Sequence, residues 1–320
     1  MLSGRQTTLQ SRVSLSGHGV HSGKPVTIIL HPAQSNHGIW FLRTGLENGT
    51  TALIPARHDQ VTSSELCTIV GNPNAGGVST VEHLMAAFYA LGVDNVLVEI
   101  DGPEMPILDG SSKPFIDAID RVGLKRLDAR RRYLKILKPV RVENGAKYSE
   151  LLPHSGGFRL TVEVLFDNPV IGHMVKTVDL DADLFRDEIA SARTFGFLKD
   201  VDHLRKAGLA LGASLDNTVA IDGDHIMNPE GLRFPDEFVR HKLLDAVGDL
   251  SLAGLQILGH YRSHSGGHRM NVSVLEALFA DSSAYEIVEG VDDERVAAAA
   301  KVQPARRHLS PALAYAPARD

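Results

Sequence analysis

The 320-residue chain lacks the features of secreted, membrane-spanning or nucleic-acid-binding proteins. Its single cysteine, Cys67, cannot form a disulfide within the chain, so we expect no disulfide framework and a reducing compartment. The first residues contain no apolar signal-peptide core, and no apolar run reaches the ~18 residues of a transmembrane helix. With 33 basic and 39 acidic residues, the net charge is −6 and no basic stripe is present. We therefore expect a cytoplasmic protein with no nucleic-acid partner and no stable membrane insertion.

The length and the hydrophobic pattern predict roughly two domains of ~150 residues each. Strand patterns at 26–30, 38–42 and 95–100 surround a helical pattern at 78–90, for which Ser79 or Thr80 is the expected N-cap. A strongly amphipathic helix is expected over 238–252. Because helices do not alternate regularly with strands, the pattern indicates an α+β fold with mainly antiparallel sheets.

Three other segments stand out by composition. Residues 124–134 are charged without an apolar period, which fits either an inter-domain connection or a solvated helix end. Residues 198–215 are rich in glycine and alanine and resemble an insertion. Residues 291–320 are rich in alanine, arginine and proline, so we expect a flexible tail.

Two short patterns supply candidate metal ligands. His241 and Asp245 are spaced i, i+4, so both lie on one face of the expected helix, and Asp249 extends that stripe. The spacing suits two ligands for one ion, but a simple hydrogen bond on a wet face is slightly favoured. Glu82 beside His83 is weak evidence alone, since a surface Glu-His dipeptide is the commoner case.

Two further patterns offer groups for acid and oxyanion chemistry. His260, His264 and His268 surround a Gly-Gly turn, where a histidine can act as a general acid or simply belong to a polar loop. Thr194 can donate a hydrogen bond to an oxyanion, and a plain turn is an equally fair reading. Together the patterns supply two histidines and one aspartate for a metal, a glutamate base and a histidine acid. Three ligands with an open fourth position are typical of catalytic zinc, and this N/O set suits Zn²⁺ without excluding Fe²⁺.

Six segments, in order along most of the chain, resemble the UDP-3-O-acyl-N-acetylglucosamine deacetylases. They are Gly17-His18-Gly19-Val20-His21-Ser22-Gly23, Thr80-Val81-Glu82-His83-Leu84, Pro106-Ile107-Leu108-Asp109-Gly110-Ser111, Ala192-Arg193-Thr194-Phe195-Gly196-Phe197, Arg240-His241-Lys242-Leu243-Leu244-Asp245 and Gly267-His268. The resemblance runs from about residue 5 to about residue 290. It implies two similar α+β domains, 1–126 and 127–290, each a layered helix/sheet sandwich with the active site between facing helix layers. An insert at about 193–218 would form a passage for an acyl chain, lined by Leu198, Leu204, Leu209, Ala210 and Leu211.

The same resemblance implies a zinc-dependent amidohydrolase of lipid A biosynthesis acting on an acylated UDP-amino-sugar. His83, His241 and Asp245 would bind the metal, and Glu82 would be the general base. His268 would protonate the leaving amine, oriented by Asp249, while Thr194 would hold the oxyanion. The other expected substrate contacts are Lys242, His21 and Lys147 at the diphosphate, Phe166 on uracil and Phe195 at the sugar.

One motif departs from the family pattern. Members often carry Lys-Ser-Gly-His where this chain has Ser265-Gly266-Gly267-His268, so the phosphate-contacting lysine is absent and Arg262 or Arg269 is the candidate to replace it. Two rival readings remain: a zinc amidase for another acylated sugar or peptide, and a binding protein for a metal or nucleotide sugar. We expect a monomer.

Overall fold

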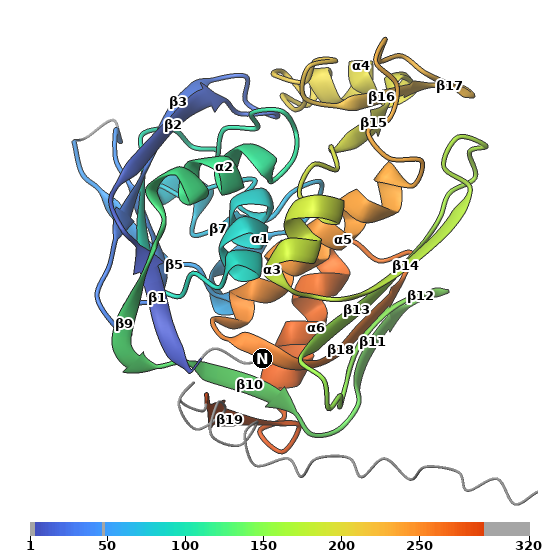
Figure 1. Cartoon of the computed structure of the whole chain (residues 1–320). Coiled ribbons are helices and arrows are strands. Elements are labelled where there is room, and N and C mark those ends of the chain that lie inside the picture. Colours follow the sequence, from blue (N-terminus) through green and yellow to red (C-terminus); the bar gives the residue numbers. More distant parts are fainter. Residues whose placement is uncertain (1–3, 47–48, 291–320) are drawn as a thin grey trace, which may run out of the picture.

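The computed structural model describes residues 4–46 and 49–290; the expected tail at 291–320 lies outside the described residues. Two main sheets form the outer walls, and the longer helices lie between them (Figure 1). The α+β class and the facing helix layers expected from the resemblance are confirmed.

The first main sheet has five strands in the order β2-β3-β8-β4-β5. Its strands are β2 (Val13–His18), β3 (Pro25–Pro32), β4 (Ile39–Arg43), β5 (Ala52–Pro55) and β8 (Val96–Ile100). Side chains alternate across the sheet, and on β3 Val26, Ile28 and Leu30 are the buried set. This apolar face packs on α1 (Glu82–Leu91) and α2 (Lys113–Val122).

The second main sheet has seven strands in the order β11-β12-β18-β10-β19, with β13 also on β18 and β14 on β13. The strands are β10 (Arg132–Ile136), β11 (Val140–Asn144), β12 (Lys147–Leu152), β13 (Phe158–Leu165), β14 (His173–Asp179), β18 (Gln256–His264) and β19 (Tyr285–Glu289). Its inner face is covered by α5 (Glu237–Leu250) and α6 (His268–Ala280) (Figure 1). Most pairings in the two main sheets are antiparallel, but β4–β8, β10–β18 and β13–β18 are parallel.

Smaller elements complete the described chain. They are β1 (Arg5–Leu9) with β9 (Leu124–Arg130), β6 (Val61–Ser63) with β7 (Ile69–Val70), and β15 (Phe195–Phe197) with β16 (Val219–Asp222) and β17 (His225–Ile226). Short helices are α3 (Ala182–Leu184), a π-helical turn (Phe185–Ile189), α4 (Leu198–Lys206) and 3-10 turns at His58–Gln60, Pro73–Ala75 and Ser251–Ala253. The elements β15, β16, β17 and α4 lie together at one end of the molecule (Figure 1).

The structure corrects two predictions from the sequence. The helix expected from residue 78 begins only at Glu82, because Val78 and Ser79 form isolated β-bridges and Thr80 has a left-handed φ of 59°. The predicted N-caps at Ser79 and Thr80 are therefore wrong, and Gly92 ends the helix in the left-handed conformation. Residues 124–130 form β9 rather than a helix end, since pairing with β1 supplies their backbone partners.

The predicted domain boundary between residues 126 and 127 lies within β9 and stays a prediction. Throughout residues 4–46 and 49–290, no helix combines the length and the apolar character needed to cross a bilayer.

Candidate active site

The candidate site forms where the first turn of α1 meets the middle of α5. A glycine, Gly248, lies on α5 directly against the backbone of Glu82, which allows the two helices to approach closely. Every residue of α1 is buried, so Glu82 and His83 point into the space between the two main sheets. The weak Glu-His pattern is thus a buried pair, and the reading as a surface dipeptide is wrong.

His83, His241 and Asp245 form a buried cluster. Their ligand atoms all lie within 4.8 Å of one another, and the three residues come from α1 and α5. The Oδ1 atom of Asp245 lies 3.3 Å from Nε2 of His241 and 3.7 Å from Nε2 of His83. The i, i+4 pair on α5 therefore faces a histidine of α1, as expected from the resemblance.

The donor set of this cluster fits a divalent cation. Asp245 Oδ1 is buried and accepts no hydrogen bond from any described residue, whereas Oδ2 accepts one from Nζ of Lys242 at 2.7 Å. An unpaired buried carboxylate oxygen is costly, and a cation between Oδ1 and the imidazoles removes that cost. Burial lowers the pKa of His241 to about 3, so its imidazole is neutral and able to ligate.

Glu82 and His268 are the candidate base and acid beside this cluster. His268, the first residue of α6, places Nε2 3.8 Å from Oε1 of Glu82 and 3.9 Å from Oδ2 of Asp245. Burial raises the pKa of Glu82. Burial alone would lower the pKa of His268, but the charges of Asp249, Glu82 and Asp245 outweigh it and raise that pKa to about 9. A buried, protonated imidazole therefore faces a buried carboxylate.

Asp249 connects His268 to two residues that no sequence pattern had singled out. Its Oδ2 accepts from Nδ1 of His268 and from Nδ2 of Asn271, both at 2.8 Å. Its Oδ1 accepts from the Thr68 hydroxyl at 2.6 Å, and the Thr68 backbone N–H donates to Oε2 of Glu82 at 3.1 Å. Asn271 is three residues after His268, so helical spacing could have identified it. Thr68 directly precedes β7 and carries no local sequence signal.

Aromatic rings form one wall beside the histidines. The ring centroid of Phe195 lies 6.3 Å from that of His241, 5.0 Å from Phe238 and 5.8 Å from Phe166. Lys242 Nζ lies 5.6 Å from the Phe195 ring. Phe195 and Lys242 thus lie beside the cluster and Phe166 contacts Phe195, while their expected substrate contacts stay predictions.

Thr194 lies beside this wall, with its backbone fixed at both ends. Its N–H donates to the Gly110 carbonyl and its own carbonyl accepts from Val219, both at 2.8 Å.

Other candidate residues have different positions. Lys147 is exposed at the start of β12, and none of its contacts within the described residues joins it to the cluster. Of the three histidines expected around the Gly-Gly turn, only His268 reaches the cluster: His264 pairs with Glu163 at 3.0 Å, and His260 contacts Thr161. Both of these histidines lie on β18, so the interpretation as a polar loop is wrong for them.

The structure also shows the surroundings of His21 and Arg262. His21 is half-buried, and its enclosed Nδ1 atom has no hydrogen-bond partner in the described part of the chain. Its backbone N–H and that of Ser22 donate to the buried Glu104, at 2.9 and 2.7 Å, which shapes the turn of the first motif. Arg262, a candidate to replace the missing lysine, is paired with Glu150 at 3.1 Å.

The insertion-like region contacts the first motif. Leu211 and Gly212 donate backbone hydrogen bonds to the carbonyls of His21 and Val20, both at 3.0 Å. A cavity of about 450 Å³ lies between these parts, lined by Gly17, His18, Ile107, Leu108, Gly212 and Asn217 among others. Leu198 and Leu211 are 44% and 51% exposed, so the region presents apolar side chains to solvent.

Comparison with known proteins agrees with this geometry. The family model described as "UDP-3-O-acyl N-acetylglycosamine deacetylase" matches residues 6–280. Proteins named UDP-3-O-acyl-N-acetylglucosamine deacetylase from Brucella ovis and Brucella abortus are each 51% identical over 285 residues, covering 89% of this chain and 98% of theirs. A protein of the same name from Brucella melitensis is 50% identical over the same length. The chain therefore belongs to the UDP-3-O-acyl N-acetylglycosamine deacetylase family.

Proposed function

We propose that this chain hydrolyses the N-acetyl group of UDP-3-O-acyl-N-acetylglucosamine, releasing acetate and UDP-3-O-acyl-glucosamine, in lipid A biosynthesis. Family membership over residues 6–280 supports this activity. The observation that carries the chemistry is the buried Oδ1 atom of Asp245, which has no hydrogen-bond partner within residues 4–46 and 49–290 and faces two imidazole nitrogens. The cytoplasmic location and the monomeric state remain predictions.

The metal would be held by His83, His241 and Asp245. When bound there, a divalent cation supplies Lewis acidity, which makes a water more acidic and polarises a carbonyl group. Two nitrogens and one carboxylate oxygen form a ligand set that suits Zn²⁺, and Fe²⁺ shares it.

Glu82 and His268 would move the two protons of the reaction. Water attacks the acetamide carbon, and Glu82 takes the proton that the water loses. When the C–N bond breaks, the leaving nitrogen receives a proton from His268, so acetate and a free amine result. Three nearby carboxylates keep His268 protonated at neutral pH, and the Thr68 N–H holds the Glu82 carboxylate.

Asp249 would orient His268, since its Oδ2 accepts from Nδ1 and leaves Nε2 as the proton donor. We propose that the Thr194 hydroxyl donates a hydrogen bond to the oxyanion that develops on the acetamide carbonyl. His21, Lys242 and Lys147 would contact the diphosphate.

The remaining substrate contacts are apolar. Phe166 would stack on uracil and Phe195 would pack near the sugar. The insert at about 193–218 would form the acyl passage, supported by the exposed Leu198 and Leu211.

The direct test measures acetate release from the acylated UDP-sugar and from its non-acylated counterpart. We expect hydrolysis of the acylated substrate to be strongly preferred, because only that substrate engages an acyl passage. Equal rates on both would favour a less specific amidase. A second measurement addresses the binding-only reading: in Glu82→Ala, turnover should collapse while the metal content stays unchanged.

A further inference from the structure

The segment 190–193 lies between α5 and the turn at residues 109–112, and one of its carbonyls contacts the metal cluster. The Ala192 carbonyl oxygen lies 3.0 Å from Nδ1 of His241. Because a carbonyl only accepts, Nδ1 must carry the hydrogen, and in the neutral ring Nε2 keeps its lone pair. The position of the Ala192 carbonyl therefore sets which nitrogen of His241 faces Asp245.

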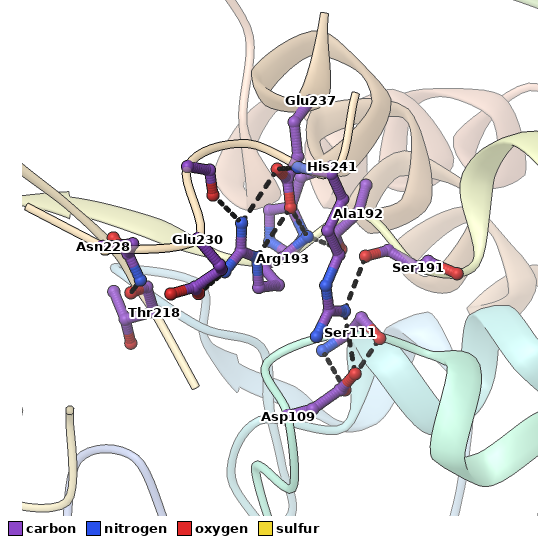
Figure 2. Close-up of polar contacts among 12 residues, drawn as sticks. Asp109, Ser111, Ser191, Ala192, Arg193, Thr218, Asn228, Glu230, Glu237 and His241 are labelled. Atoms are coloured by element: carbon purple, nitrogen blue, oxygen red, sulfur yellow. Dashed lines mark hydrogen bonds and ion pairs between the residues drawn. The ribbon is translucent and has the colours of Figure 1, made fainter. Parts of the chain in front are cut away.

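The next residue along, Arg193, fastens this segment to α5. Its backbone N–H and its Nε both donate to Oε1 of Glu237 at 2.9 Å, and a terminal guanidinium nitrogen donates to Oε2 at 3.2 Å. Arg193 is 1% exposed and Glu237 is fully buried. Glu237 lies four residues before His241, so one helical turn of α5 carries both the anchor and the histidine (Figure 2).

A second arginine connects this anchor to the first half of the chain. Arg233 donates its backbone N–H to Oε2 of Glu237 at 2.6 Å. Its guanidinium donates to the Asp109 carboxylate at 2.8 Å and to the Ser191 carbonyl at 2.9 Å. Arg233 thus joins Asp109, in the third of the six motifs, to the segment that carries Ala192.

Stability alone is a poor explanation for this pair. A buried ion pair often contributes no more to folding than well-packed apolar residues of similar volume. In contrast, groups that hold a metal-binding histidine through its second nitrogen commonly change metal affinity or activity 10–100-fold when they are removed. The Ala192 carbonyl makes a contact of that second kind, and the Arg193–Glu237 pair holds the segment that carries this carbonyl.

We propose that Arg193 and Glu237 are positioning residues whose buried ion pair holds the Ala192 carbonyl on Nδ1 of His241 and so keeps Nε2 directed at the metal site. This inference rests on the proposed metal site. The pair acts through the backbone of the segment and touches neither substrate nor metal.

The test compares Zn²⁺ affinity of metal-stripped full-length variants by competition with a chromophoric chelator. In Glu237→Gln, an amide NH₂ replaces one carboxylate oxygen, so the donors of Arg193 and Arg233 lose an acceptor. We expect Zn²⁺ affinity to fall about 10–100-fold. If wild-type protein binds no Zn²⁺, the proposed function itself fails. If wild type binds and a folded Glu237→Gln binds equally well, only the present inference is overturned.

The matched control is Glu230→Gln. Glu230 also accepts from the Arg193 guanidinium, but its side chain is 54% exposed and makes no contact with the Arg193 backbone. Its substitution should leave Zn²⁺ affinity within about twofold, since solvent can replace an exposed partner. An equal loss in both variants would contradict a role specific to Glu237.

A paired replacement separates positioning from folding. Arg193→Met with Glu237→Leu keeps similar volume and removes both buried charges, although the backbone N–H groups of Arg193 and Arg233 lose their acceptor. The thermal midpoint should therefore fall less than in Glu237→Leu alone, which leaves the Arg193 charge buried and unpaired. We expect Zn²⁺ affinity to remain low, because nothing then fixes the Ala192 carbonyl; wild-type affinity in this variant would overturn the proposal. If Glu237→Gln or the paired variant does not fold, the deciding variant is Arg193→Lys. Lysine keeps the positive charge but cannot donate to both carboxylate oxygens of Glu237 as the guanidinium does, so Zn²⁺ affinity should again fall, and wild-type affinity would overturn the proposal.

Discussion

Gly248 of α5 lies against the carbonyl of Glu82 so closely that a Cβ atom at position 248 would be 2.0 Å from that oxygen. No real side-chain atom tolerates such a distance, so the two helices can cross here only at a glycine. This contact brings Glu82 and His83 of α1 within reach of His241 and Asp245 of α5. The crossing therefore sets the geometry of the whole candidate site.

Gly248→Ala should disrupt the site even though alanine favours helices. The clash with the Glu82 backbone must displace α1 from α5, at a cost of about 1–3 kcal/mol. We expect a lower thermal midpoint and weaker Zn²⁺ binding, measured by calorimetry and chelator competition. Gly196→Ala is the control, because a Cβ there meets nothing within 4 Å. A Gly248→Ala variant with normal metal affinity would show that the crossing is adaptable.

Asp245→Ala should lose the metal. It removes the carboxylate that faces both imidazoles and leaves two neutral ligands, which bind a divalent cation poorly. Metal content measured after dialysis should fall well below that of wild type. Asp236→Ala, which removes an aspartate just before the start of α5, should retain the metal. Full occupancy in Asp245→Ala would mean that other groups hold the ion.

His268→Ala should retain the metal and lose rate. General acid–base groups typically contribute ~10²–10⁴-fold, and we expect kcat to fall within that range. The check is kcat together with metal content on the same preparation. Turnover near that of wild type would exclude His268 as the proton donor.

The pH–rate profile should be bell-shaped. Glu82 must be deprotonated, and burial raises its pKa, so the acidic limb should lie above the ordinary value of 4.5. His268 must be protonated, and activity should be lost as pH rises through its pKa, between the ordinary 6.5 and about 9. Asp249→Asn removes a charge that raises this pKa, so the alkaline limb should move to lower pH. If the alkaline limb stays at the same pH, Asp249 does not act on the proton donor.

Leu211→Ser should reduce the preference for long acyl chains. Leu211 is exposed in the insert, where an acyl chain would cover it, and losing that contact should cost up to about tenfold in kcat/KM. The assay uses substrates with acyl chains of graded length. Leu124→Ser, at an exposed site on β9, should leave the preference unchanged. A uniform loss across all chain lengths would argue against contact with the chain.

Local spacing in the sequence was enough for part of the site. The i, i+4 pair His241 and Asp245 had to share a helix face, because helical periodicity is a property of neighbouring residues. The same periodicity placed the helix over 238–252 almost correctly, and the strands at 26–30 and 95–100 followed from buried alternation. The start of α1 was misplaced, since the left-handed φ of Thr80 depends on contacts with distant strands.

The order of residues by itself determined the class of the fold, the ligand types and, through six separated motifs, the family to which the chain belongs. Only the tertiary structure decided that Glu82 is buried, that Thr68 and Asn271 hold Asp249, and that Arg193 and Glu237 fasten the segment beside His241. Each of these contacts joins residues on different elements, separated by 22 residues for Asn271 and Asp249 and by 181 for Thr68 and Asp249. Burial and hydrogen bonding between such residues arise from the packing of separate elements. The sequence pattern gives the spacing of residues along one element but not the distance between two elements.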